Sequence, residues 1–158
     1  MGAAYFYHLT RSSAEATLQT LAAKSLQVGW RVVVRGRSDA FLDRLDEVLW
    51  LRPEEGFLPH GRAGGPHDAD QPVLLSTASD IPNGAACLMS VEGAEISPEE
   101  VQSLDRVCIL FDGGNGDAVA HARTQWKALT GAGCAAQYWS EEGGRWEMKA
   151  ENGGVSAD

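Results

Sequence analysis

The stretch AYFYHLTRSSAEATLQTLAAKSLQVGWRVVVRG, residues 4–36, combines two kinds of hydrophobic pattern. The aromatic run at residues 4–9 predicts a strand, and the β-branched run at residues 31–35 predicts a second one. Between them, apolar residues recur every three or four positions. This spacing predicts a helix that begins at a capping box of Ser12 and Glu15 and ends at the next glycine. Strand, helix and strand in this order predict a right-handed crossover and a parallel sheet.

The alternation continues along the chain. Ser38 is predicted to cap a second helix, and the segment RVCILFDGGNGDAVAHARTQWKALTGAGCAAQYW, residues 106–139, predicts a buried strand, a helix and another strand. The remaining predicted elements are strands at residues 73–76, 86–91 and 145–149, and a short helix opened by Ser97, Pro98 and Glu100. The Pro- and Gly-rich residues 52–72 predict a long ordered loop anchored by Phe57 and Leu58. We therefore predict one α/β domain over residues 1–149, with a central, largely parallel sheet and flanking helices, followed by a flexible polar tail at 150–158.

Composition and charge exclude several classes of protein. The 158 residues include 13 basic and 22 acidic ones, for a net charge of -9, which disfavours general nucleic-acid binding. No apolar run is long enough to span a membrane, and the N-terminus lacks the pattern of a leader peptide. Cys87, Cys108 and Cys134 lie in apolar runs without metal-ligand spacing, which predicts buried free thiols in a cytoplasmic protein. The acidity is concentrated at residues 63–158, where five basic residues face fifteen acidic ones.

The glycine-rich loop at residues 112–117 stands where an α/β protein would bind a nucleotide phosphate, between a strand and a helix N-terminus. It lacks the usual glycine fingerprint and a following lysine, and Asp112 and Asp117 would repel a phosphate. A nucleotide-binding enzyme is therefore the alternative hypothesis, against a plain glycine-rich turn. A weak metal site at His60, His67 and their neighbours Asp68 and Asp70 is a further alternative, and we expect neither metal nor cofactor.

The helix predicted at residues 117–130 carries a more specific pattern. Arg123, Trp126 and Lys127 are spaced to share one face, within an otherwise acidic part of the chain. An arginine fork, a mobile ammonium and an aromatic wall suit an acidic peptide or a C-terminal carboxylate. The alternative is a solvated helix face with the tryptophan half buried against the sheet.

A second candidate surface lies in LDEVLWLRPEEGFLPH, residues 45–60. Trp50, Phe57 and Pro59 crowd the end of a predicted helix and the start of the loop after it. Exposed aromatic residues and proline there would mark a protein–protein interface. Equally, Trp50 and Phe57 could pin the loop to the core.

Three segments together resemble a known family. FYHL at residues 6–9, RLDEVLWLRPEEGFLPH at 44–60 and ARTQWKALTGAG at 122–133 are similar, in order and spacing, to the chi subunit of bacterial DNA polymerase III holoenzyme. The resemblance runs from about Ala4 to Trp139. It implies a non-catalytic adaptor of the clamp loader complex, with a nucleotide-binding-like (Rossmann-like) fold that holds no nucleotide. It also implies binding to the acidic, Phe-ended C-terminal tail of single-stranded DNA-binding protein, contact with DNA only through that protein, and pairing in many members with a psi subunit.

The resemblance assigns roles to individual residues. Arg123 and Lys127 correspond to the basic residues that bind the tail, Trp126 to the wall of the pocket for its terminal Phe, and Gly133 to the glycine that closes it. Two departures imply a shallower pocket and a lower affinity: Cys134 replaces a bulkier aromatic, and Val119 stands where the helix could carry another basic residue.

The resemblance also implies that Trp50 and Phe57, beside Pro59, form the surface used for psi. A structural subunit whose only contact is this second surface remains a third hypothesis.

Overall fold

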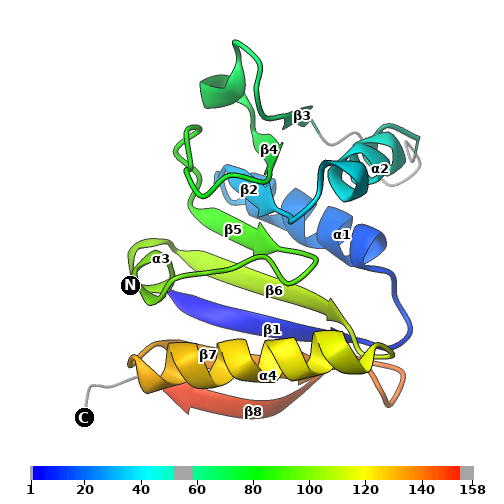
Figure 1. Ribbon diagram of the computed structural model, residues 1–158, viewed down its shortest axis with the longest axis vertical. Coiled ribbons are helices and arrows are strands. Elements are labelled where there is room, and N and C mark those ends of the chain that lie inside the picture. The colour runs from blue at the N-terminus through cyan, green and yellow to red at the C-terminus, as the bar shows by residue number, and fades with distance from the viewer. Residues whose placement is uncertain (1, 52–58, 154–158) are drawn as a thin grey trace.

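The computed structural model describes residues 2–51 and 59–153. It is built on an eight-stranded sheet in the order β3-β4-β2-β5-β6-β1-β7-β8, parallel except for the antiparallel edge strand β8 (Figure 1). The strands are β1 (Ala3–Leu9), β2 (Val32–Arg35), β3 (Gly61–Arg62), β4 (Val73–Ser76), β5 (Cys87–Ser90), β6 (Arg106–Asp112), β7 (Ala135–Ser140) and β8 (Glu147–Gly153). The predicted fold class, an α/β domain with a largely parallel, Rossmann-like sheet, is confirmed.

In the described part of the chain, four helices cover the sheet, two on each face. They are α1 (Ala14–Gln27), α2 (Asp39–Leu51), α3 (Pro98–Ser103) and α4 (Gly116–Gly131). Figure 1 shows α4 in front of the sheet near β1 and β7, with α1 behind it. Leu18 of α1 and Leu45 of α2 pack on one face of the sheet, whereas Val101 of α3 and Leu129 of α4 pack on the other. Successive residues along a strand contribute to the two cores in turn, because their side chains point to opposite faces of the sheet.

Local sequence signals set most of the helix ends. The predicted capping box before α3 is present: the Ser97 side chain accepts a hydrogen bond from the Glu100 amide, and the Glu100 carboxylate accepts one from the Ser97 amide. The predicted capping box of Ser12 and Glu15 is wrong by one residue. Ser13 caps α1 instead, by accepting from the Ala16 amide. Ser12 is unavailable because its hydroxyl and its amide both donate to the Glu141 carboxylate.

Two predicted boundaries also differ from the structure. The segment expected to be one loop up to residue 72 contains the short strand β3 and a 3-10 turn, η2 (Asp68–Asp70), while the expected anchors Phe57 and Leu58 lie outside the described residues. The last strand starts and ends later than predicted. β8 continues to Gly153, past the expected start of the tail at residue 150, because it pairs with β7 along the full length of that strand.

A buried ion pair joins the carboxyl end of β2 to helix α3. The Arg35 guanidinium, only 4% exposed, donates to both oxygens of Glu100 at 2.9 and 2.8 Å, and to the backbone carbonyls of Ala78, Ser79 and Glu95. Burial alone would raise the Glu100 pKa. The hydrogen bonds from Arg35 and from Ser97 outweigh that effect and hold the Glu100 pKa below its usual value.

Within the described residues, no helix is both long enough and apolar enough to cross a membrane.

Candidate functional site on helix α4

Helix α4 is held firmly at both ends. At its start, the Asn115 side chain accepts hydrogen bonds from the amides of Asp117 and Ala118. At its end, Gly133 adopts a positive φ of 91°, and the next amide donates back to the carbonyl of Leu129. A left-handed residue favours glycine, which explains why the chain carries one at this turn. The helix therefore presents its side chains from a rigid base.

The predicted cluster of Arg123, Trp126 and Lys127 lies on one side of α4. Arg123 and Lys127 are exposed, whereas Trp126 is half-buried and packs against the core on the α4 side of the sheet. The Trp126 ring meets the rings of Phe6 and Tyr138 edge to face, with centroids 5.3 and 6.0 Å apart. In the described part of the chain, neither cation forms an ion pair or a side-chain hydrogen bond. Two solvent-exposed cations therefore flank a fixed aromatic ring.

Tyr138 and His8 extend this cluster, and sequence analysis missed both. The Tyr138 hydroxyl lies 2.7 Å from Nδ1 of His8. Burial raises the pKa of the Tyr138 phenol, while the nearby positive charge of Arg123 lowers it. The signal was weak in the sequence, because His8 and Tyr138 are 130 residues apart and meet only through the pairing of β1 with β7.

We call Arg123, Trp126, Lys127 and Tyr138 the α4 cationic surface. Gly133 stands about two turns beyond Trp126 along the helix, at its carboxyl end. Cys134 is buried and directed towards α3, where its Sγ lies 3.7 Å from the carbonyl of Pro98. The structure therefore brings the three predicted helix residues onto one side of α4, while Gly133 lies in the turn that follows the helix.

The second predicted surface is only partly described. Trp50, near the end of α2, is 53% exposed, and its ring centroid lies 4.8 Å from that of His60. His60 is buried, with its Nε2 2.9 Å from a carboxylate oxygen of Asp46. Pro59 is half-buried next to it, and Phe57 lies outside the described residues. An exposed tryptophan on a pinned helix end is suited to a protein contact.

The glycine-rich loop offers little to a phosphate. The Gly113 amide donates to the carbonyl of Leu9, and the Gly114 amide donates to the Asp112 carboxylate. The amides of Asp117 and Ala118 donate to the side-chain oxygen of Asn115. A phosphate site at a helix start needs such amides free. A side chain at position 113 would also collide with the ring of His8. Most of the amides in this turn are therefore used internally, which counts against the nucleotide hypothesis.

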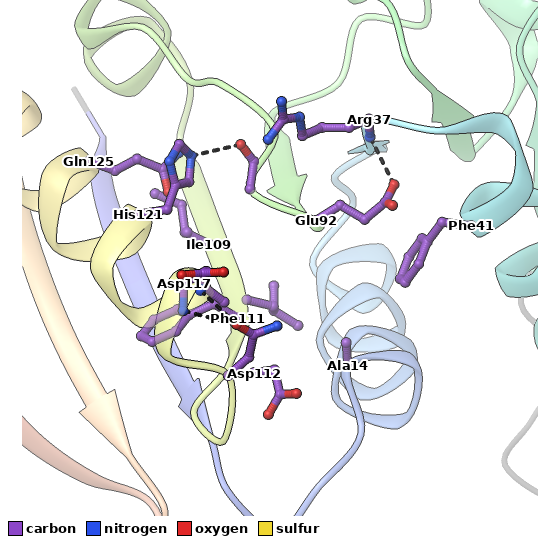
Figure 2. A pocket seen from close by; sticks show the side chains of 14 residues that line it. Ala14, Arg37, Phe41, Glu92, Ile109, Phe111, Asp112, Asp117, His121 and Gln125 are labelled. Atoms are coloured by element: carbon purple, nitrogen blue, oxygen red, sulfur yellow. Dashed lines mark hydrogen bonds between the residues drawn. The ribbon is translucent and has the colours of Figure 1, made fainter.

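A cavity of about 410 Å³ lies beside this loop, lined on the α4 side by Asp117, His121 and Gln125 (Figure 2). Asp112, Asp117 and Glu92 give its lining a negative character, with Arg37 as the opposing charge. The Glu92 carboxylate accepts from the amide of Arg37, and His121 Nε2 lies 2.9 Å from the carbonyl of Gly93. These groups hold loops together, and the acidic lining is unsuited to a nucleotide.

The histidines and acids proposed as a metal site do not converge. His60 is buried against Asp46, whereas His67 is exposed, with its Nδ1 4.0 Å from Asp70. The Asp68 carboxylate instead accepts hydrogen bonds from the amides of two neighbouring glycines. Over residues 2–51 and 59–153, no group of three metal-ligating side chains comes together.

Comparison with known proteins identifies the family. Residues 1–137 match the profile of the family described as DNA polymerase III chi subunit, HolC. The chain belongs to the DNA polymerase III chi subunit family. The match covers α4 with Arg123, Trp126, Lys127 and Gly133, as well as the segment from Trp50 to Pro59, and it ends just before Tyr138.

Two chi relatives are similar over shorter segments. The DNA polymerase III subunit chi of Escherichia coli is 41% identical over 65 residues, which cover 41% of this chain and 44% of that protein. The probable DNA polymerase III subunit chi of Rickettsia prowazekii is 27% identical over 75 residues, covering 44% and 46%. The chain thus matches less than half the length of each of these relatives.

Proposed function

We propose that this chi-family protein is a non-catalytic accessory subunit of the bacterial replicase, working in the cytoplasm without a cofactor. In this proposal it binds the acidic C-terminal tail of single-stranded DNA-binding protein at the α4 cationic surface, and so links that protein to DNA polymerase III during replication. The observation that carries the proposal is a pair of exposed cations beside the fixed ring of Trp126: Arg123 and Lys127 form no ion pair with any residue that the structure describes.

Each residue has a distinct part in binding the tail. The planar guanidinium of Arg123 can pair with the terminal carboxylate of the tail, through two parallel hydrogen bonds. Trp126 and Tyr138 provide an aromatic wall for the terminal Phe ring, because aromatic rings favour edge-to-face packing. Lys127 attracts the acidic residues that precede the Phe, as a mobile point charge. Gly133 leaves the end of this surface open to the peptide backbone.

The second surface is proposed to contact the polymerase side of the complex. Trp50, Phe57 and Pro59 would bind a clamp-loader protein, a psi subunit where one is present, while α4 binds the tail. The exposure of Trp50 and its packing on His60 support this assignment. Because the chain carries a net charge of -9, we expect contact with DNA to be indirect, through the single-stranded DNA-binding protein.

Calorimetric titration with two forms of one peptide tests the tail proposal. An acidic peptide that ends in Phe with a free carboxylate should bind with a Kd on the order of micromolar, about -8 kcal/mol. The same peptide with an amidated C-terminus should bind at least tenfold more weakly, because Arg123 then loses its charged partner. Equal binding of the two forms would contradict the role of Arg123, and no binding of either would contradict the proposed function.

A nucleotide titration tests the alternative hypothesis. We expect no saturable binding of ATP or GTP at micromolar concentration, since most amides of the glycine-rich loop are used internally. Saturable binding that is lost on mutation of Asn115, which shapes that loop, would favour the enzyme hypothesis instead.

A further inference from the structure

A second groove lies on the opposite face of the sheet from α4. Helix α1 packs against β2 and β6, so the adjoining face of β1 and β7 is left beside the helix rather than beneath it (Figure 1). The hollow between them has a volume of about 420 Å³. We call it the α1 groove, and the side chains that matter for its chemistry are Tyr7, Leu21, Lys24, Arg106, Trp139 and Trp146.

Aromatic rings form the apolar part of the groove. Tyr7 and Trp139 are register partners on β1 and β7, so their side chains point to the same face. Trp146, from the turn before β8, meets the ring of Tyr7 edge to face, with centroids 5.5 Å apart. The Trp139 indole donates to the amide oxygen of Gln137, which fixes its orientation. The rings are therefore held in place before any ligand arrives.

The charged residues that line the groove are both cations. Lys24 is exposed on α1, and Arg106 begins β6. The Arg106 guanidinium lies over the rings of Tyr5 and Trp30, 4.4 and 5.8 Å from their centroids. Within the described ranges, neither cation forms an ion pair or a hydrogen bond through its side chain. Both also line an adjoining cavity of about 160 Å³ that reaches Val28, an exposed apolar side chain.

The rim of the groove is fixed by a buried carboxylate. Glu141, 4% exposed at the end of β7, accepts hydrogen bonds from the amides of Thr10, Arg11 and Ser12 and from the Ser12 hydroxyl, at 2.8–3.0 Å. This carboxylate joins the β7 side of the groove to the start of α1. The groove is thus a preformed surface rather than a gap between independent loops.

We propose that the α1 groove docks an apolar segment of a partner protein that carries one or two carboxylates. Two unpaired cations beside fixed aromatic rings complement such a segment in both charge and apolar surface. A nucleic acid fits less well, because its many phosphates would meet only two cations. The groove is separate from α4, and its occupant does not need a free C-terminus.

Fluorescence anisotropy with a labelled, amidated Leu-Asp-Phe-Asp-Leu peptide tests this proposal on the full chain. The peptide lacks a terminal carboxylate, so it discriminates between the groove and the α4 cationic surface. We expect saturable binding that weakens at least tenfold in Thr20→Trp, which places a bulky ring on the exposed α1 side of the groove. Lys24→Gln combined with Arg106→Gln should cause a similar loss. Arg37→Gln, which removes one exposed cation elsewhere, is the matched control and should leave binding unchanged.

Because Arg106 packs on two rings, the double variant could lose stability. The two single variants Thr20→Trp and Lys24→Gln leave Arg106 in place, and they keep the test decisive. In the wild type, an NMR titration should shift the indole signals of Trp139 and Trp146, and not the amides of α4. The proposal is overturned by the absence of binding, by unchanged binding in Thr20→Trp and Lys24→Gln, or by shifts confined to α4. Displacement of the peptide by a single-stranded oligothymidine at physiological salt would also overturn it, in favour of nucleic acid. None of these results bears on the binding of a free-acid tail, which Arg123→Ala tests separately.

Discussion

Arg35 and Arg123 are two arginines of one chain in opposite surroundings. Arg35 is buried, and its donors are occupied by the Glu100 carboxylate and three backbone carbonyls. Arg123 is exposed on α4, with no such partner among the described residues. A guanidinium whose donors are all bonded within the protein contributes to the stability of the fold, whereas one whose donors are free can bind a ligand. The same contrast separates Glu141, whose oxygens accept four hydrogen bonds, from Lys24 and Lys127, which are exposed and form no ion pair with any described residue.

The largest expected effect is on the buried side of this contrast. Arg35→Ala should lower the free energy of unfolding by about 3 kcal/mol or more, because it leaves the Glu100 carboxylate without its partner. Urea denaturation followed by circular dichroism measures this. Arg37→Gln, two residues further along and exposed, is the control and should stay within about 0.5 kcal/mol of wild type. A similarly small change in Arg35→Ala would show that the buried pair is not part of the stability of the fold.

On the exposed side, Arg123→Ala should weaken binding of the free-acid tail peptide by about 1.5–3 kcal/mol, the value of a hydrogen bond to a charged group. Its unfolding free energy should change by no more than about 0.5 kcal/mol. Calorimetry and urea denaturation of the same preparation measure the two quantities. If the stability falls and the affinity does not, Arg123 has a structural role like that of Arg35, and the contrast between the two arginines is wrong.

Glu141→Gln should lower the free energy of unfolding by about 1–2 kcal/mol, because the amide keeps one acceptor oxygen, which accepts more weakly than a carboxylate, and its NH2 group cannot accept a hydrogen bond. Its exposed neighbour offers the matched control, Glu142→Gln, for which we expect almost no change. Equal stability of the two variants would indicate that the turn at residues 10–12 does not depend on the charge of Glu141.

The same carboxylates give the fold a sensitivity to acid. Hydrogen bonds from Ser12, Arg11 and Thr10 outweigh burial and hold the Glu141 pKa below its usual value, as the contacts of Arg35 and Ser97 do for Glu100. A lowered folded pKa contributes stability above the unfolded value of about 4.3, and the contribution is lost as the pH falls through the folded pKa. Thermal unfolding between pH 6 and pH 3 should therefore show a steeper loss for wild type than for Glu141→Gln.

The smallest effect is expected at Lys127. Lys127→Ala should weaken tail binding by less than about 1 kcal/mol, since an exposed ammonium is well hydrated and screened by salt. Titrations at two salt concentrations check this, because the difference between wild type and Lys127→Ala should shrink as the salt concentration rises. A loss as large as that of Arg123→Ala would instead make Lys127 the main partner of the terminal carboxylate.

How much could be predicted from the sequence depends on the separation of the interacting residues. The capping box at Ser97 and the helix carrying Arg123, Trp126 and Lys127 depend on residues a few positions apart, and both were predicted. The cap of α1 was displaced to Ser13 because Ser12 binds Glu141, 129 residues away. No local pattern contains that contact.

The missed parts of the two surfaces have the same origin. Tyr138 and His8 meet only once β7 has paired with β1, and Lys24 approaches Arg106 only when α1 crosses the sheet. The order of the strands, which the sequence pattern does not fix, decides these contacts. A continuous run of hydrophobic residues, as in β2 and β6, indicates that a strand is buried on both faces, but not which strands flank it.

The position of β1 has a consequence for the way the chain is made. This strand is synthesised before the other strands of the sheet, yet both of its partners, β6 and β7, come from residues beyond 105. At a synthesis rate of about 5–20 residues per second, the aromatic β1 segment waits roughly 5–20 s before either partner exists. We therefore expect nascent chains that stop before β6 to be the form most prone to aggregation, and a chaperone that shields β1 during this interval to increase the yield of folded protein.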